Sequence, residues 1–143
     1  MKISMGLDIG DKTIGVAISD GLGITAQSLT TIERKNMSAD IDSIKKIIDG
    51  HHVEEIIIGL PKNMNGSIGS QAKKTIQFTK RLKRDVDIPV IPWDERLTTV
   101  MATKALIEGD LSRKKRKKRI DKIAAQLILQ NYLDRKNFLS KQR

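Results

Sequence analysis

Two spacing patterns of apolar residues divide the sequence and limit the folds that it can adopt. Residues 2–10, 13–19 and 24–33 are short strand-like runs separated by turn residues at 11–12 and 20–23, which predicts an antiparallel meander. The rest of the chain alternates helical spacing with apolar runs. Early hairpins require antiparallel pairing, and later strand–helix–strand units require parallel pairing. We therefore predict an α/β fold with a mixed sheet covered by helices.

The same reasoning gives the bounds of the later elements. A helix is expected from Ser38, as its N-cap, to Gly50, followed by a strand at Glu55–Leu60 that is buried on both faces. The remaining predicted elements are a helix over 70–84, a strand over 88–93, a helix over 98–108 and a last helix over 120–137. No repeat or linker divides the chain, so residues 1–143 are expected to form one domain.

Positive charge is concentrated at one end of the chain. The sequence has 27 Lys and Arg residues against 17 Asp and Glu residues, a net charge of +10. Residues 1–111 contain 15 of each sign, whereas residues 112–143 contain 12 basic and 2 acidic residues and so account for the whole excess. An unbroken basic run consists of Arg113, Lys114, Lys115, Arg116, Lys117, Lys118 and Arg119.

We predict that residues 109–118 form a flexible basic loop. Because adjacent like charges repel, the basic run should stay extended until a polyanion neutralises it. By itself the run fits nucleic-acid binding and simple solubility equally well.

Two absences narrow the class of protein. The sequence has no cysteine, which excludes disulfides, thiolate catalysis and Cys-ligated zinc. No apolar run approaches the roughly 20 residues of a membrane-spanning helix, and the N-terminus does not have the pattern of a signal peptide. We therefore expect a cytoplasmic protein with no membrane partner.

Asp8 is a carboxylate inside the first predicted strand, between Leu7 and Ile9. A buried carboxylate needs a cation, a hydrogen-bond network or a place at the mouth of the sheet. Gly6 and Gly10 lie on its side of the strand and leave space beside it. A structural, hydrogen-bonded Asp is an equally good interpretation of this residue alone.

Glu95 and Asp121 are two further candidates. Glu95 follows the fifth predicted strand, where sites in sheets with parallel strands gather, although for this residue alone a helix-terminal carboxylate favoured by the dipole is the better interpretation. Asp121 shares a helix face with Ala124, Ala125 and Ile128, and small residues there would let the helix approach the sheet. Each signal alone is weak.

Taken together, Asp8, Glu95 and Asp121 form an all-oxygen ligand set that suits Mg²⁺ or Mn²⁺. Two such ions about 3.5–4 Å apart can stabilise the attacking and leaving oxygens of a phosphodiester displacement. The basic run that could bind phosphates begins beside Asp121. The sequence therefore favours a metal-dependent phosphodiesterase acting on nucleic acid.

Four ordered motifs resemble the YqgF-type (RuvX-like) nucleases, described as Holliday junction resolvases and as pre-16S ribosomal RNA processing nucleases. The motifs lie at residues 6–17, 59–66, 94–99 and 120–125. The resemblance implies a ribonuclease H-like fold with five strands in the order 3-2-1-4-5 and helices on both faces. It also implies a metal-dependent site at Asp8, Glu95 and Asp121. Asp11 and Asp94 are the nearest candidates for a fourth carboxylate.

Other polar residues have two interpretations each. Lys62 and Asn63, in the loop after a buried strand, could reach a phosphate or belong to an ordinary loop. Arg96 could bind the scissile phosphate or pair with a neighbouring acid. A second basic cluster, interpreted as a solvated helix face, consists of Lys73, Lys74, Lys80, Arg81, Lys83 and Arg84.

Aromatic residues make up only 3% of the chain, which favours backbone contact with structured nucleic acid over base stacking. The resemblance to the YqgF-type nucleases implies hydrolysis of a ribosomal RNA precursor, at the 5′ end of 16S RNA, or of branched DNA. Symmetrical cutting of two strands would need a homodimer. The alternative is a ribosome-assembly or transcription factor that binds nucleic acid with little catalysis.

Overall fold

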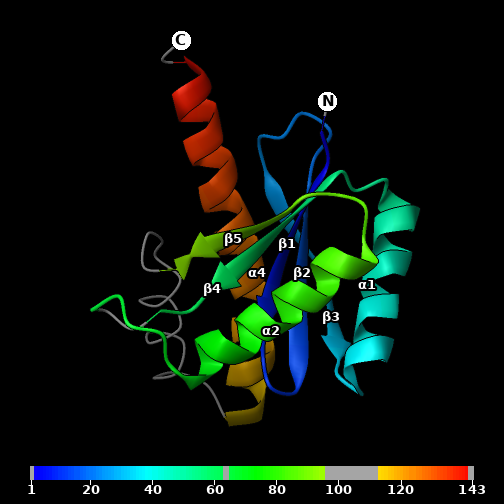
Figure 1. Cartoon of the computed structure of the whole chain (residues 1–143). Helices are drawn as coiled ribbons and strands as arrows, with labels where there is room; N and C mark the ends of the chain where they lie inside the picture. The colour runs from blue at the N-terminus through cyan, green and yellow to red at the C-terminus, as the bar shows by residue number, and fades with distance from the viewer. Residues whose placement is uncertain (1, 63–64, 96–112, 142–143) are drawn as a thin grey trace.

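The computed structural model describes residues 2–62, 65–95 and 113–141. They form one five-stranded sheet in the order β3-β2-β1-β4-β5 and three helices (Figure 1). The elements are β1 (Ser4–Ile9), β2 (Thr13–Ser19), β3 (Ala26–Glu33), α1 (Met37–His51), β4 (Glu55–Leu60), α2 (Ser70–Asp85), β5 (Val90–Asp94) and α4 (Arg113–Lys141).

The pairing of the strands confirms the predicted mixed sheet. β1 pairs with β2, and β2 with β3, in antiparallel fashion. β1 also pairs with β4, and β4 with β5, in parallel fashion. The early hairpins and the later strand–helix–strand units therefore meet at β1, the central strand, and the strand order 3-2-1-4-5 is as predicted.

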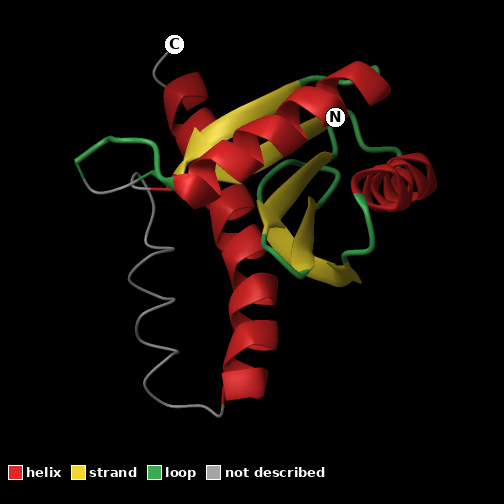
Figure 2. Ribbon diagram, turned by 60° about the horizontal axis from the view of Figure 1, so that its bottom comes forward, coloured by secondary structure: helices red, strands yellow, loops and turns green. Residues whose placement is uncertain are grey.

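Helices cover both faces of the sheet, as predicted (Figure 2). On one face, the large side chains of β1 and β4 pack with those of α1 and α2, including Ile44 and Phe78. On the other face, α4 lies across the sheet and contributes Ala124, Ala125 and larger aliphatic residues. Although α4 has 29 residues, no helix in the described ranges is long and apolar enough to cross a membrane.

The basic run is helical, so the prediction of an extended loop over 109–118 is wrong from Arg113 onward. The α4 helix begins at Arg113, seven residues before the predicted start at 120. Lys and Arg have high intrinsic helix propensity, whereas a like-charge pair four residues apart costs only a few tenths of a kcal/mol. The helix, which packs on the sheet from Ala124 onward, therefore continues through the charged run toward its N-terminus.

The first turn of α1 also differs from the prediction. Asn36, and not Ser38, is the N-cap, and its side chain accepts a hydrogen bond of 2.9 Å from the amide of Ala39. Gly50 lies inside the helix, which ends where His52 adopts a left-handed conformation with φ of 56°. The predicted helix over 98–108 lies outside the described residues.

Candidate active site

Asp8 lies near the carboxyl end of β1, the central strand, on the face of the sheet that α4 covers. By the alternation of side chains along β1, Asp8 points to the face opposite Leu7 and Ile9, and only 7% of it is exposed. Gly6 and Gly10 are its neighbours on that face of β1. Gly15 lies directly opposite Asp8 on β2. Three positions around the carboxylate therefore have no side chain.

Glu95 lies just beyond β5, the edge strand two positions from β1. The group formed by Asp8, Gly15, Gly59 and Glu95 is called the carboxylate hollow below. Leu7 pairs with Ile58, so the parallel register places Gly59 beside Asp8, about 4.8 Å away in a regular sheet. A Cβ added to Gly59 would lie 2.8 Å from Oε1 of Glu95. The Glu95 carboxylate, only 2% exposed, thus packs over Gly59 together with the side chain of Ile128 from α4.

The α4 helix rests directly on β1 because Gly6 has no side chain. A Cβ at this position would lie 2.8 Å from Cβ of Leu129 and 2.9 Å from the carbonyl oxygen of Ala125. Ala125 is completely buried. The close approach of helix and strand therefore depends on a glycine in β1 facing a small residue in α4.

Hydrogen bonds fix the direction of α4 over the sheet. Gln130 accepts from the amide of Ala26 at 2.8 Å, and the hydroxyl of Ser28 donates to Gln126 at 3.1 Å. α4 therefore runs antiparallel to β3. Because β1 and β3 are both antiparallel to β2, they run in the same direction, and α4 is antiparallel to β1 as well. Moving along β1 from Gly6 toward its carboxyl end thus leads toward the N-terminal part of α4.

Asp121 belongs to that part of α4. Its position on the helix is one turn, about 6 Å, before Ala125, and so on the Asp8 side of the Gly6 contact. Its side chain lies outside the described part of the structure. Among the side chains that are described, no group of three His, Cys, Asp or Glu residues could hold a metal ion. A three-carboxylate site therefore depends on Asp121.

The ligand types fit a hard divalent cation. Asp8 and Glu95 offer only carboxylate oxygens, which are the donors preferred by Mg²⁺ and Mn²⁺. Burial of both carboxylates is the second point of agreement, because Asp8 is 7% and Glu95 2% exposed, and a cation offsets the cost of burying their charge. The residues that are described are thus compatible with the predicted ion.

The candidates for a fourth carboxylate lie elsewhere. Asp94 precedes Glu95 and points to the other face of the sheet, where its Oδ2 lies 3.9 Å from Nζ of Lys62. Asp11 lies in the β1–β2 turn with 60% of its side chain exposed, and it pairs with Lys74 at 3.1 Å. Both carboxylates have basic partners of their own.

The predicted nucleic-acid contacts are only partly described. Lys62 follows β4 directly and is 29% exposed. Asn63 and Arg96 lie outside the described residues. The run Arg113–Arg119 forms the first two turns of α4, and its backbone alone is described.

The C-terminal half of α4 is anchored at the other end of the sheet, where β1 and β4 begin. Glu55, only 3% exposed, accepts a hydrogen bond of 2.6 Å from Ser4 and lies 3.7 Å from Nζ of Lys136. Burial, followed by the charge of Glu55 and a hydrogen bond to it, raises the pKa of Tyr132 to about 12. Tyr132 also packs edge-on against Trp93. This cluster fixes the helix and is distant from Asp8 along β1.

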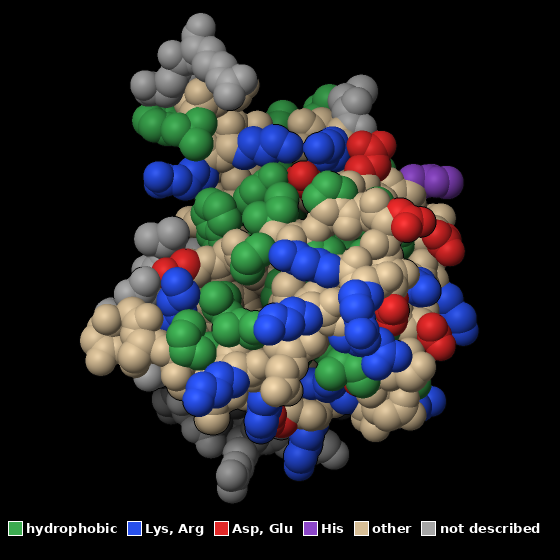
Figure 3. All heavy atoms as spheres, in the orientation of Figure 1, with side chains coloured by type: hydrophobic (Ala, Val, Ile, Leu, Met, Phe, Trp, Pro, Cys, Tyr) green, Lys and Arg blue, Asp and Glu red, His purple; other side chains and the backbone are tan. Residues whose placement is uncertain are grey.

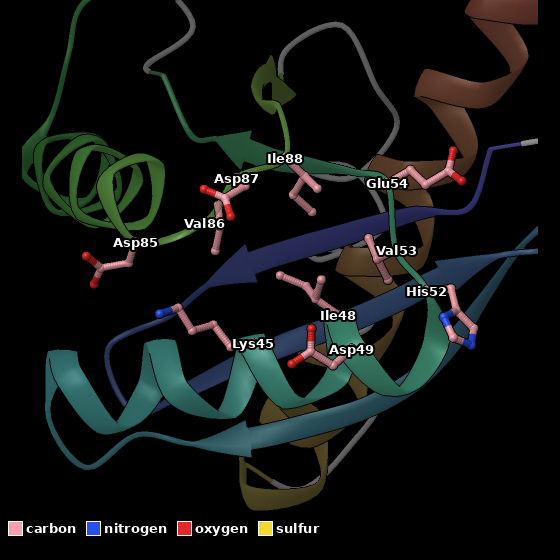
Figure 4. Close-up of a pocket in the computed structure, with 10 residues that line it drawn as sticks. All are labelled: Lys45, Ile48, Asp49, His52, Val53, Glu54, Asp85, Val86, Asp87 and Ile88. Atoms are coloured by element: carbon pink, nitrogen blue, oxygen red, sulfur yellow. The ribbon is translucent and has the colours of Figure 1, made fainter.

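A cleft of about 630 Å³ lies at the same end of the sheet, between the end of α1 and the α2–β5 connection (Figure 4). Val53 and Glu54, which line it, immediately precede β4, whereas Asp8 and Glu95 lie at the carboxyl ends of the strands. Figure 4 shows carboxylates of Asp49 and Asp87 around an apolar floor. The cleft and the carboxylate hollow are therefore separate features.

Comparison with known proteins identifies the family. The family model described as "RuvX: Holliday junction resolvase" matches residues 2–135. The chain belongs to the RuvX family. A Clostridium botulinum (strain Hall) protein named "Putative pre-16S rRNA nuclease" is 58% identical over 130 residues, covering 91% of this chain and 95% of its own. The Clostridium kluyveri relative of the same name is 58% identical over 131 residues, covering 92% and 96%.

Solved structures confirm the predicted ribonuclease H-like fold of this RuvX family member. Thermus thermophilus RuvC, in complex with a Holliday junction substrate, has a TM-score of 0.59 at 10% identity, with 95% of this chain and 97% of RuvC covered. The fowlpox virus Holliday junction resolvase has a TM-score of 0.53 at 18% identity, with 92% and 98% covered. At these identities the likeness concerns the fold.

Sequence reasoning missed the contribution of Gly15 and Gly59. Both fall in predicted strand runs and in motifs of the family resemblance, but neither was given a role: Gly15 lies opposite Asp8, and Gly59 lies under Glu95 and Ile128. The available signal was the position of Gly59 inside the run Ile56–Leu60, because glycine in a buried strand indicates close approach of another group.

Proposed function

We propose that this protein is a nuclease that hydrolyses phosphodiester bonds of structured nucleic acid with Mg²⁺ or Mn²⁺ held by Asp8, Glu95 and Asp121. The observation that carries the proposal is the pair of buried carboxylates, Asp8 and Glu95, in a hollow bordered by glycines. Membership of the RuvX family supports the same activity.

The protein's own residues hold and orient the reacting groups. Asp8, on the central strand, and Glu95, just beyond an edge strand, are fixed by the sheet, and Asp121 would complete the set from α4. A bound Mg²⁺ or Mn²⁺ supplies activation of water and stabilisation of the negative charge that develops on the phosphate. Because the carboxylates are buried on the face under α4, they need little rearrangement before the substrate binds.

The first two turns of α4 are proposed to bind the phosphate backbone. Arg113–Arg119 place seven basic residues at the positive end of the helix dipole, where anions are favoured. Phosphates of a nucleic acid would neutralise this charge and release counterions. Lys62, Asn63 and Arg96 are proposed as further phosphate contacts, since they follow the strand ends nearest the hollow.

The relatives' names and the family description suggest two substrates, a pre-16S ribosomal RNA and a Holliday junction. Both are structured nucleic acids, and both present the same phosphate charge. We propose activity on this shared feature, in the cytoplasm, where both substrates occur. Cutting two strands symmetrically would require a homodimer, which sedimentation with a junction substrate would reveal.

A cleavage assay with Asp8→Asn tests the proposal. The substrates are a four-way junction, duplex DNA and a precursor ribosomal RNA, each in Mg²⁺ and in Mn²⁺. We expect Asp8→Asn to lower the cleavage rate at least a thousandfold and to leave binding intact. Asp42→Asn, an exposed carboxylate on α1, is the matched control and should retain full activity. Cleavage by Asp8→Asn at the wild-type rate would refute the site.

A further inference from the structure

The α2 helix has a strongly basic surface that the proposed site does not use. Over Ser70–Asp85 it has six basic residues and one acidic residue, and Lys and Arg side chains gather on the face of the molecule that α2 presents (Figure 3). Its opposite side is buried, with Phe78 and Leu82 among the core residues. The charge therefore lies on the solvent side of an anchored, rigid helix.

Three of these residues form one line along the helix. Lys73, Lys80 and Arg84 are separated by seven and four residues, which places them within about 40° of one another around the helix axis. All three side chains are exposed. The line, here called the α2 stripe, extends about 16 Å along the helix at 1.5 Å per residue.

The stripe differs from the adjacent Lys74 and Arg81 in having no internal counter-charge. Lys83, on another side of the helix, also has no ion pair within the described part of the chain. Lys74 pairs with Asp11 at 3.1 Å, and Arg81 pairs with Asp85 at 3.1 Å. No ion pair of Lys73, Lys80 or Arg84 occurs within the described part of the chain. These three cations are therefore available to an external anion.

The stripe begins next to the carboxylate hollow. Gln71, in the first turn of α2, donates a hydrogen bond of 3.0 Å to the carbonyl oxygen of Ile9, the residue after Asp8. In Figure 1 the first turns of α2 and of α4 both lie toward the end of the sheet where β1 ends. Figure 2 shows that the two helices cover opposite faces and that the first turns of α4 extend beyond the sheet. A polyanion that crosses this end of the sheet can contact both helices.

We propose that the α2 stripe binds the sugar–phosphate backbone of a nucleic-acid arm that leads away from the cleavage site. This inference rests on the proposed function, because it takes the hollow at Asp8 as the place of cleavage. A length of about 16 Å corresponds to about five base-pair steps along a duplex axis, at 3.4 Å per step. Lysine and arginine contacts of this kind position the nucleic acid and do not read its sequence.

The test removes the three charges together. The triple variant Lys73→Gln, Lys80→Gln and Arg84→Gln keeps good helix formers at exposed positions. Its affinity for a four-way junction and for duplex DNA is measured by fluorescence anisotropy in EDTA, from 50 to 200 mM salt. We expect at least tenfold weaker binding at the lowest salt. The slope of log K against log salt should decrease by up to about 2.7, since each lost phosphate contact contributes about 0.9.

A matched control separates the stripe from net charge. The control is a triple variant with the same loss of three charges at exposed residues, Lys35→Gln, Lys45→Gln and Lys46→Gln, and it should bind within twofold of wild type. A variant with Lys73→Arg and Lys80→Arg, which keeps the charge, should also bind normally. Equal affinity of the stripe variant and the control would overturn the inference.

The catalytic proposal fails by a different result. Asp8→Asn in the same titration should bind like wild type, and its cleavage rate is measured separately. Normal cleavage by Asp8→Asn would refute the active site and the inference that rests on it. Loss of cleavage in Asp8→Asn, with unchanged binding of the stripe variant, would refute the stripe alone.

Discussion

The two faces of the sheet are packed in opposite ways. On the face toward α1 and α2, completely buried large side chains such as Leu7, Ile58 and Phe78 fill the space between the layers. On the face toward α4, the helix backbone lies directly against Gly6, and the side chains of Ile128 and Glu95 lie over Gly59. The first face supplies most of the buried apolar bulk, whereas the second leaves room for the carboxylates of the candidate site.

Because large side chains fill the face toward α1 and α2, we expect substitutions that remove side-chain volume there to destabilise the protein. Phe78→Ala should lower the free energy of unfolding by about 3–5 kcal/mol, because it removes a fully buried ring and leaves a cavity. Such a loss is large for a domain whose total is typically about 5–15 kcal/mol. Urea denaturation measures the change.

Phe138→Ala is the matched control for this substitution. Phe138 is 61% exposed near the end of α4, so its removal should change the free energy of unfolding by less than about 0.5 kcal/mol. Equal losses in the two variants would contradict the assignment of the core to the α1–α2 face.

The α4 face should instead be sensitive to gain of volume. Gly6→Ala should lower the free energy of unfolding by about 1–3 kcal/mol, because the new Cβ meets the backbone of Ala125 and Cβ of Leu129, neither of which can swing away. Gly50→Ala, in α1 with nothing within 4 Å of the new Cβ, should raise it by about 0.5–1 kcal/mol. A neutral Gly6→Ala in thermal and urea unfolding would show that helix and strand are less close than described.

The smallest expected effect concerns the anchor of α4 at Glu55. The pKa of Tyr132 rises from 10.0 to about 12 in the folded protein, so its neutral form is favoured by folding. The resulting stability is fully present below pH 10 and is lost as the pH rises through 12. Tyr132→Phe should remove this part of the pH dependence. Denaturation at pH 9 to 12 should then give a shallower decline for the variant, and identical slopes would count against the Glu55 contact.

Much of the fold follows from the sequence because local spacing and chain connectivity determine it. The short runs before residue 33 could pair only as hairpins, and Glu55–Leu60 was recognisable as a buried strand. Asp8 and Glu95 could be named as candidates because one lies inside a strand and the other directly beyond a strand end, and both are buried in the structure; their role in a metal site stays a prediction. The RuvX family assignment confirmed the resemblance carried by the motifs around them.

The errors arose where tertiary packing or competing local signals decide the outcome. The length of α4 was underestimated because charge repulsion in Arg113–Arg119 was given more weight than helix propensity. Asn36 and Ser38 are both good N-caps by type, and the sequence alone does not choose between them. The role of Gly59 was missed because the need for glycine there comes from packing against Glu95. That residue is 36 positions away, and only the β4–β5 pairing brings it close.

The central claim is that Glu95 belongs to a metal-binding hollow and its neighbour Asp94 does not. Isothermal titration calorimetry with Mn²⁺ on wild type, Glu95→Gln and Asp94→Asn tests this claim most directly, because the two variants remove adjacent carboxylates from opposite faces of β5. We predict that Glu95→Gln weakens Mn²⁺ binding at least a hundredfold, and that Asp94→Asn binds within threefold of wild type. Equal Mn²⁺ affinity in wild type and Glu95→Gln would contradict the account.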